Sequence, residues 1–328
     1  MGSPRTSCDA PARRPRPRDR RLLVRLLVAA MLLGWPVRLP GADCGAHTDS
    51  ASASAATAWR IVVVIAGESD PAVAKQVAAL GANALATITP PRLETALAAE
   101  SAGLAYLPRF STREIDRLSG DAGRVESIRG MPAIAGFQYI DEDVEEGYAS
   151  PETQARAYGI LKALFPGRLV LYATRLDLIA TDAGFLPGFY RPEFTDLVVP
   201  YFYPVGTTVL GVQEESDPWE SRLRSLLVPV AAATPEGKPI LPVLQAFEQI
   251  GHPVGGGLPR RQLRLYAELW PGNPNIAAFW WGGPLNEPLL GISDLPRLAR
   301  GVQELFGAAP SRPSPCRLSP RSPVESPP

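Results

Sequence analysis

The stretch that decides the fold is Ala133-Ile-Ala-Gly-Phe-Gln-Tyr-Ile-Asp-Glu-Asp143, a short apolar run that ends abruptly in acids. A run of this length with β-branched and aromatic residues predicts a buried strand. Carboxylates at the carboxyl end of a strand indicate a site when the strand belongs to a parallel barrel or an open α/β sheet. The stretch therefore predicts a buried parallel strand with acids placed for chemistry at its end.

The amide of Gln138, inside the run, indicates which face of the strand looks inward. A strand packed between helices and a barrel lumen offers no polar surroundings on its outer face, so Gln138 is expected to point into the lumen. Side chains alternate along a strand, so Glu142 shares this face and Asp141 takes the other. Glu142 is therefore the first candidate for catalysis, with Asp141 beside it. The alternative is a solvated acidic strand end.

Apolar runs and amphipathic segments alternate through residues 59–307, which we expect to form a single domain. Strands are predicted at residues 59–66, 82–88, 103–107, 133–143, 169–173, 195–203, 239–247 and 276–281. Helices are predicted at residues 71–80, 91–101, 112–128, 151–165, 174–183, 216–232, 258–269 and 293–306. Eight alternations over about 250 residues are typical of an α/β fold of the (β/α)8 TIM barrel type.

Two features bear on the competing fold and on the strand assignment. An open doubly wound sheet carries a glycine-rich phosphate loop after its first strand, whereas the loop here reads Ala66-Gly-Glu-Ser-Asp70. Pro200 and Pro242 lie inside two predicted strands, where each removes a hydrogen-bond donor. A bulge or a later strand start would accommodate them.

Composition excludes several classes of function. The chain has 328 residues, of which 45% are hydrophobic, and this is enough for one large core. Its formal net charge is +0, which gives no electrostatic basis for binding nucleic acid. The cysteines, Cys8, Cys44 and Cys316, fall outside the predicted barrel, so no disulfide framework holds it. Only two histidines occur, which argues against a histidine-based zinc site. We expect neither a metal nor a cofactor.

Residues 1–46 have the layout of a signal or export segment. An arginine-rich start is followed by an apolar run from Leu22 to Trp35, too short for a comfortable membrane span. Asp43 stands where a lipidated cysteine needs a small residue, which argues against a lipid anchor at Cys44. The sequence predicts a secreted or periplasmic protein with no membrane span in the mature chain; an uncleaved membrane anchor is the alternative.

Two further segments lack the apolar periodicity of a folded domain. Residues 47–58 are mainly Ser, Ala and Thr and are expected to be a flexible linker. Residues 308–328 are rich in Pro, Ser and Arg and are expected to be a disordered tail.

Aromatic side chains recur where the predicted strands end. Flat aromatic faces beside acids and amides suit a pyranose ring, whose C–H face is apolar and whose rim carries hydroxyls. Each aromatic residue taken alone is more readily explained as ordinary core. As a set, the residues predicted to bind substrate are Tyr106, Gln138, Tyr139, Tyr172, Tyr201, Tyr203, Gln245, Trp280 and Trp281.

A second acid, Glu248, follows the seventh predicted strand. The fourth and seventh strands of an eight-stranded barrel lie opposite each other, so Glu142 and Glu248 would face each other across the mouth. Hydrolysis of a glycosidic bond uses such a pair, one as acid and one as nucleophile or base. Alternation argues against this arrangement. If Gln245 and Phe247 face the lumen, Glu248 faces away from it unless the strand has ended before residue 248.

The chain resembles the broad (β/α)8 glycoside hydrolase superfamily, particularly its exported and poorly characterised bacterial branch. The segments that carry the resemblance are 136–143, 196–204, 242–248 and 278–282. The resemblance implies that Glu142 is the acid/base and Glu248 the nucleophile. It departs from the family where many retaining members have Asn-Glu, since Asp141 precedes Glu142 here. Gln138 and Ile140 replace the acids of chitinase-like members, which argues against substrate-assisted catalysis.

The resemblance implies a glycosidase that cleaves O-glycosidic bonds in an oligo- or polysaccharide with a carboxylate pair. The alternative is a barrel that binds glycan without cleaving it, or an envelope scaffold. A third class, enzymes of phosphorylated substrates, rests on the glycine-rich loops at residues 251–257 and 282–283. The acids at residues 141–146 could bind calcium or magnesium, but no known loop spacing fits them.

Overall fold

The structure is a computed structural model of the whole chain. It describes residues 61–67, 71–140, 150–176, 180–181, 184–185, 190–205, 219–249, 252–282 and 289–307. The chain divides into two units, Met1–Ser52 and Ala53–Pro328, and all described residues belong to the second. The predicted export segment, linker and C-terminal tail lie outside the described residues, as do Asp141 and Glu142.

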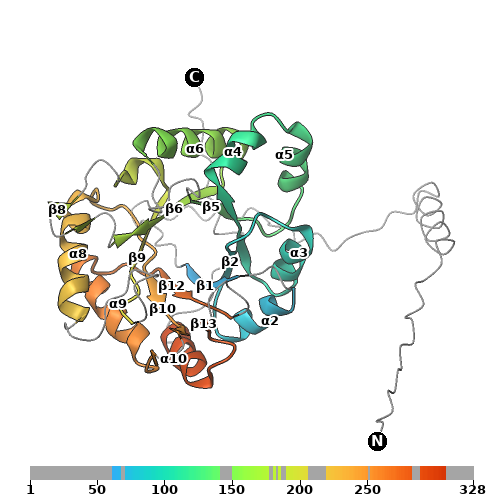
Figure 1. Cartoon of the computed structure of the whole chain (residues 1–328). Coiled ribbons are helices and arrows are strands. Elements are labelled where there is room, and N and C mark those ends of the chain that lie inside the picture. Colours follow the sequence, from blue (N-terminus) through green and yellow to red (C-terminus); the bar gives the residue numbers. More distant parts are fainter. Residues whose placement is uncertain are drawn as a thin grey trace, which may run out of the picture. The chain divides into compact units, whose positions relative to one another are not determined.

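The described strands form a parallel sheet that closes into a barrel (Figure 1). The sheet has the order β3-β2-β1-β12-β10-β9-β6-β5-β4. Its two ends, β3 and β4, are halves of one strand interrupted by Pro108, and a bridge from Tyr106 to Ile134 joins β3 to the segment before β5. The predicted (β/α)8 TIM barrel is therefore confirmed. The strands are β1 (Val62–Ala66), β2 (Ala84–Thr87), β3 (Ala105–Leu107), β4 (Arg109–Ser111), β5 (Gly136–Ile140), β6 (Leu169–Arg175), β9 (Leu197–Tyr201), β10 (Val243–Gln245) and β12 (Ile276–Phe279).

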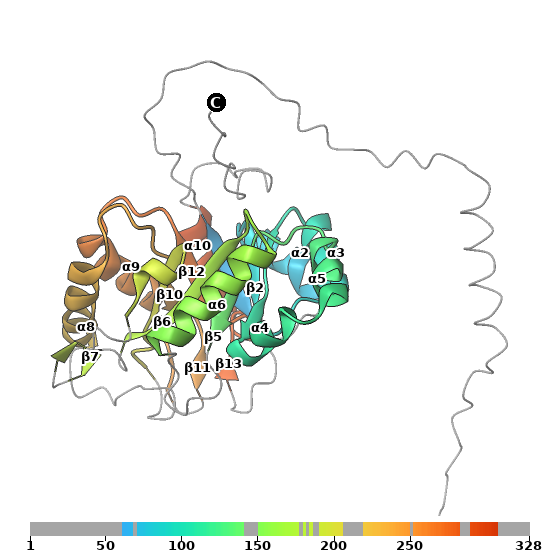
Figure 2. The ribbon, with the colours of Figure 1, turned by 90° about the horizontal axis from the view of Figure 1, so that it is seen from above.

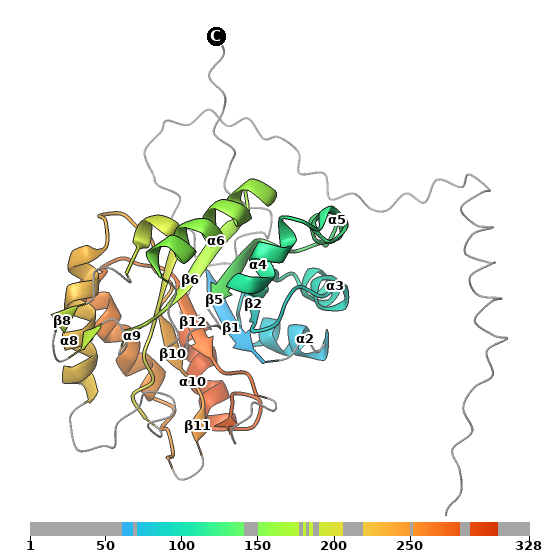
Figure 3. The same ribbon diagram turned by 45° about the horizontal axis from the view of Figure 1, so that its top comes forward.

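Helices surround the strands on the outside (Figures 1 and 3). Local signals set several of their starts: Ser111 and Glu114 form a reciprocal capping box at α4, and Ser150 caps α6 ahead of Pro151. The helices are α2 (Pro71–Ala79), α3 (Leu93–Ser101), α4 (Thr112–Leu118), α5 (Ala122–Arg129), α6 (Pro151–Leu164), α8 (Trp219–Ala233), α9 (Leu258–Leu269) and α10 (Pro296–Gly307), with a short 3-10 helix at Pro192–Phe194.

The helix predicted at residues 174–183 is wrong. β6 continues through Arg175, and the two short strands β7 (Ala180–Thr181) and β8 (Gly184–Phe185) pair in antiparallel fashion beyond it. The predicted strand was too short by two residues because Thr174 and Arg175 were assigned to the helix. This matters for the site, since Arg175 now ends a barrel strand.

The two prolines are accommodated in different ways. β10 begins only after Pro242, whose carbonyl still accepts a hydrogen bond from the amide of Ala277. Pro200 lies within β9 and aligns with Thr174 of β6. The ladder between β9 and β10 is reduced to a single aligned pair, Val243 with Tyr201. The missing donor of Pro200 thus falls on the thinly bonded side of its strand.

Alternation along the strands produces two hydrophobic cores. In β1, Val62 and Val64 belong to the cluster that contains the buried residues of the helices. Val63 and Ile65 belong to a second cluster formed by residues from the strands and the segments that adjoin them. The first cluster is therefore the layer between barrel and helices, and the second fills the barrel interior.

A small two-stranded sheet lies at the end of the barrel where the strands finish. β11 (Glu248–Gln249) pairs in antiparallel fashion with β13 (Leu289–Leu290), and both follow strands of the barrel (Figure 2). We call this end of the barrel the mouth and the opposite end the bottom. Within the described ranges, no helix combines the length and the hydrophobicity of a membrane span.

Candidate functional site

A cavity of about 280 Å³ opens at the mouth, among the carboxyl ends of the barrel strands. In barrels of this type the loops and strand ends at this side build the active sites. The side chains that give the cavity its chemistry are Arg109, Gln138, Arg175, Tyr201, Tyr203 and Phe279. They come from five strand ends and combine two cations, one amide and three aromatic rings. This cavity is the candidate functional site.

Gln138 lies on the inner face of β5, where alternation placed it. Its neighbours Phe137 and Tyr139 belong to the layer beneath the helices, while Gln138 lines the cavity. The side-chain amide donates to the carbonyl oxygen of Leu107 at 2.9 Å, which fixes its orientation. Because the NH2 group is bound in this way, the amide oxygen of Gln138 is left as a hydrogen-bond acceptor at the cavity wall.

The aromatic wall of the cavity centres on Tyr203. Its ring stacks on Phe279 with a centroid distance of 5.2 Å, lies 5.5 Å from Tyr201, and meets Phe247 edge to face at 5.0 Å. Burial raises the pKa of Tyr203 well above its ordinary value, and the positive charge of nearby arginines only partly opposes this rise. Tyr203 is therefore a neutral hydroxyl at physiological pH, able to donate or accept a hydrogen bond.

Arg109 and Arg175 are cavity residues that the sequence analysis missed. Arg109 begins β4 and aligns with Gln138, while Arg175 ends β6 and aligns with Tyr201. Both lie close enough to Tyr203 to influence its ionisation. The signal was present in the alternation, since Arg175 follows Leu171 and Ala173 on the inward face at intervals of two. It was missed because the predicted strand stopped at residue 173.

Three of the predicted substrate-binding tyrosines are anchored in the layer between the barrel and the helices. Tyr106 shares a hydrogen bond with the hydroxyl of Thr87 at 3.2 Å. Tyr139 donates to the carbonyl of Phe194 at 3.1 Å and stacks on Tyr172 with a centroid distance of 4.8 Å. Tyr106 and Tyr172 occupy outward positions of their strands and do not line the cavity, so their roles in substrate binding stay predictions. Tyr139 touches the cavity edge from the same outward position.

Gln245, Trp280 and Trp281 are not brought to the cavity either. Gln245 is fully buried and its side chain is bound to both the amide and the carbonyl of Val205. Trp280 is fully buried against Gly67, where a Cβ would lie 2.2 Å from the indole. Trp281 faces the helix layer. All three side chains pack within the protein away from the cavity lining, and their roles in substrate binding stay predictions.

Glu248 points away from the mouth. Its carboxylate accepts a hydrogen bond from the amide of Val254 and forms an ion pair with Arg297 in the first turn of α10. It is only 7% exposed and does not line the cavity. Phe247 fills the barrel interior, so alternation turns Glu248 outward, as the sequence analysis warned. The structure does not bring Glu248 to the site as a facing carboxylate.

Asp141 and Glu142 follow directly after Ile140, the last residue of β5, and lie outside the described residues. Their catalytic roles stay predictions. Within the part of the chain that the structure describes, no group of three His, Cys, Asp or Glu side chains could hold a metal ion. The chemistry of the described mouth is therefore that of amide, phenol and guanidinium groups on aromatic surfaces.

No known family model matches this sequence, and no curated protein is similar to it. Solved structures are similar to it in fold. One is a GH5_18 variant from Streptomyces cattleya in complex with Manβ1-4GlcNAc, with a TM-score of 0.53 and 15% identity over 78% of this chain and 83% of that chain. Another is the spore cortex-lytic enzyme SleL of Bacillus megaterium, with a TM-score of 0.51 and 11% identity over 75% and 73% of the two chains. At these identities the likeness concerns the fold alone, and the chain shares the α/β-barrel architecture of these two proteins.

Proposed function

We propose that this protein is a glycoside hydrolase-like barrel that binds an oligo- or polysaccharide at its mouth. The observation that carries the proposal is the cavity at the strand ends, where Tyr201, Tyr203 and Phe279 present aromatic surfaces beside hydrogen-bonding side chains. An aromatic face matches the C–H face of a pyranose, and polar groups at its rim match the hydroxyls. The barrel fold alone would not carry this, because it hosts many unrelated functions.

Different cavity residues would contact different parts of a bound sugar. Stacked Tyr203 and Phe279 form the surface on which a sugar ring would lie. Gln138 supplies an amide held in place by Leu107, and Arg109 and Arg175 supply cationic donors on either side of it. A cavity of about 280 Å³ is of the size for one or two sugar rings, near the lower end of small-molecule sites.

Hydrolysis of an O-glycosidic bond is the reaction we propose for this site, with Glu142 as the acid that protonates the leaving oxygen. Asp141 is its neighbour in sequence and the further candidate carboxylate. The resemblance assigns the nucleophile to Glu248, but to act in this role its carboxylate would have to leave Arg297 and Val254. A catalytic pair of Glu142 and Glu248 would therefore require a rearrangement at β11.

The second candidate function is glycan binding without cleavage. The position of Glu248 favours it. The carboxylate of Glu248 faces outward in an ion pair and does not line the cavity, so the catalytic acids predicted for the mouth are then only those that follow β5. The same aromatic cavity would serve a binding protein equally well.

Export to the periplasm or the exterior is part of the proposal, since polysaccharides are met there. Support comes from the basic and then apolar residues 1–46. Cell fractionation of the expressed full chain checks it: recovery of the barrel in the cytoplasm with residues 1–46 retained would contradict export.

The experiment that separates the two functions combines a binding screen with a release assay. Wild-type protein is titrated against a polysaccharide panel by calorimetry, and the same mixtures are assayed for new reducing ends. Binding with release supports the glycosidase. Binding without release supports the binding protein. Absence of binding to any carbohydrate, in a folded protein, contradicts both.

A further inference from the structure

Two arginines line the cavity at the mouth, and strands of the barrel hold both of them. Arg109 begins β4 and aligns with the inward-facing Gln138 of β5. Arg175 ends β6 and follows Leu171 and Ala173 on the inward face of that strand. Side chains on strands are positioned more precisely than side chains on loops. The two positive charges are therefore part of the barrel wall at this site.

The two guanidinium groups start from different depths of the barrel. Arg109 is level with Gln138 and Leu171, because these residues align across β4, β5 and β6. Arg175 comes four residues after Leu171, which places its Cα about 13 Å further along the strand toward the mouth. Both charges nevertheless act on one group. Burial raises the pKa of Tyr203, and the charges of Arg175 and Arg109 each lower it. The two cations therefore converge on the aromatic wall of the cavity.

In the lining that the structure describes, no acid accompanies these two charges. The other described residues of the lining are apolar or aromatic, apart from the amide of Gln138. Arg109 and Arg175 each have a further interaction within the protein. A guanidinium group has five N–H donors, so it can keep such an interaction and bind a ligand as well. Both side chains are half-buried, and a charge that is partly removed from water favours an anionic partner. The cavity therefore favours a ligand with a negative charge.

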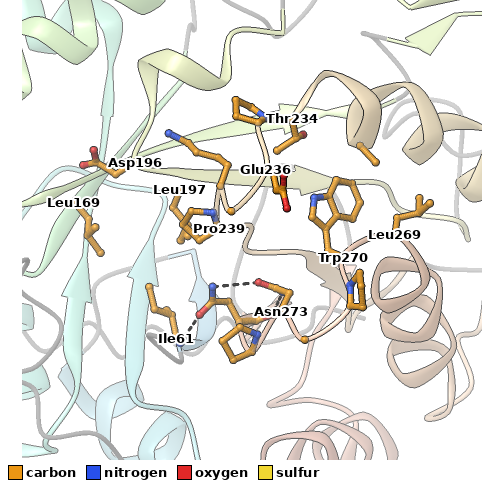
Figure 4. A pocket seen from close by; sticks show the side chains of 18 of the residues that line it. Ile61, Leu169, Asp196, Leu197, Thr234, Glu236, Pro239, Leu269, Trp270 and Asn273 are labelled. Carbon is orange, nitrogen blue, oxygen red and sulfur yellow. Dashed lines mark hydrogen bonds between the residues drawn. The ribbon is translucent and has the colours of Figure 1, made fainter. Parts of the chain in front are cut away.

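The hollow at the bottom of the barrel has a different balance of charges (Figure 4). It has a volume of about 920 Å³, and its floor consists of Ile61, Leu169 and Leu197, where three barrel strands begin. The charged residues of its lining are two lysines and two acids, namely Lys162, Lys238, Asp196 and Glu236. Lys162 and Asp196 form an ion pair at 2.9 Å. Charges of both signs thus occur together at the bottom, whereas the charged side chains in the described lining of the mouth are all cations.

We propose that the sugar recognised at the mouth carries a carboxylate, as a uronic acid does, and that Arg109 and Arg175 bind this carboxylate. The planar guanidinium group matches a carboxylate, to which it can donate two parallel hydrogen bonds. The ring of such a sugar keeps the apolar C–H face that suits the stacked rings of Tyr203 and Phe279. The inference rests on the proposed function, because it names the substrate class of the same cavity.

A carboxylate suits this cavity better than a phosphate group does. Phosphate sites in barrels and other α/β folds use the backbone N–H groups of glycine-rich loops and helix N-termini. The described residues that line the cavity include no glycine and no residue of a helix. The donors that this lining offers come from side chains, and the charged ones are planar guanidinium groups.

The first test compares two forms of the same ligand on the wild-type full chain. Tetrasaccharides of galacturonic acid, of mannuronic acid and of hyaluronan are titrated by calorimetry. Each is measured beside the same sugar after chemical reduction of its carboxyl groups to alcohols, which removes the charge and keeps the rings and linkages. At least one acidic tetrasaccharide is expected to bind about tenfold or more tightly than its reduced form, because reduction removes charge-assisted hydrogen bonds.

Variants then test which residues bind the carboxylate. Arg109→Gln and Arg175→Gln are each expected to bind the acidic tetrasaccharide about tenfold more weakly, and to bind its reduced form like the wild type. Arg224→Gln is the matched control, because Arg224 lies on α8 outside the cavity and pairs with Glu268 at the surface. It should leave both affinities unchanged. Thermal unfolding checks that each variant is folded, and the comparison of the two ligands on the wild type does not depend on any variant.

The outcomes separate this inference from the proposed function. Neutral sugars that bind as tightly as the acidic ones would overturn the inference and leave a glycan-binding barrel. Tighter binding of a sulfated galactan tetrasaccharide than of every carboxylated one would assign the cations to sulfate and also overturn it. A preference for the acidic form that both Arg109→Gln and Arg175→Gln retain would overturn the roles of these arginines. Absence of binding to any glycan, acidic or neutral, would contradict the proposed function itself and the inference with it.

Discussion

The two ends of the barrel differ in size and in chemistry. The hollow at the bottom, at about 920 Å³, is larger than the mouth cavity of about 280 Å³. Its floor is apolar and Lys162 forms an ion pair with Asp196 at its edge, whereas the mouth presents Arg109, Gln138 and Arg175 beside aromatic rings. In barrels the bottom serves stability and the mouth serves chemistry. The comparison teaches that cavity size does not identify a site, whereas the side chains at the strand ends do.

Variants at each end test this contrast. Substitutions at the mouth should change glycan binding or hydrolysis and leave stability unchanged, and substitutions at the bottom should lower stability and leave glycan binding unchanged. The largest expected effect is at the mouth. Glu142→Gln removes the proposed acid and is expected to lower glycan hydrolysis at least about 100-fold. Reducing-end assays measure the loss, and thermal unfolding should be unchanged. A variant with turnover near wild type would show that the acid is elsewhere.

At the bottom, Asn275→Ala is expected to lower the free energy of unfolding by about 1–3 kcal/mol, because the buried amide of Ile61 and the carbonyl of Ile240 lose their partner. Chemical denaturation measures this change. Glycan affinity should match wild type, since the residue lies at the far end of the barrel. A large loss of affinity at unchanged stability would contradict the division between the ends.

Glu248 offers a sharper comparison, since resemblance assigns it to the mouth and the structure turns it toward α10. Glu248→Gln keeps an acceptor for the amide of Val254 and loses the ion pair with Arg297. We expect a stability loss of about 1–3 kcal/mol, and a larger loss for the matched variant Arg297→Gln, which leaves the buried carboxylate without its cation. Turnover of both variants is expected to match wild type, because neither residue lines the cavity. If Glu248→Gln alone abolishes hydrolysis, Glu248 is the nucleophile after all.

The smallest expected effect concerns the hydroxyl of Tyr203. Tyr203→Phe keeps the stack on Phe279 and removes one hydrogen-bonding group from the cavity. Affinity for the glycan is expected to fall by about 2- to 12-fold, the equivalent of one neutral hydrogen bond of roughly 0.5–1.5 kcal/mol. Isothermal titration calorimetry measures the change. Tyr172→Phe, on the outward face, is the control and should bind like wild type.

The sequence predicted the barrel and the inward face of β5 because apolar runs, alternation and the polar Gln138 are local signals. It failed where the side of a strand had to be assigned without such a marker. Tyr106 is the middle residue of β3 and Tyr172 lies within β6, and both take the outward face, which an apolar run alone does not determine. Arg175 was missed because the end of its strand depends on pairing with β9, which no local pattern reports.

For Glu248, alternation predicted the outward direction and the resemblance predicted the inward one. The structure agrees with alternation, because the buried Phe247 fixes which way the next side chain points. The partner of Glu248 could not have been foreseen, since Arg297 lies 49 residues further along the chain and meets it only through the packing of α10. Long-range packing of this kind is what local sequence patterns leave undetermined.

The most direct measurement is a crystal structure of the Glu142→Gln variant with the tightest-binding oligosaccharide from the panel. Our account predicts a sugar ring lying on Tyr203 and Phe279, with its hydroxyls in reach of Gln138 and the arginines. Sugar bound only in the bottom hollow, or on the outer helices with an empty mouth, would contradict it.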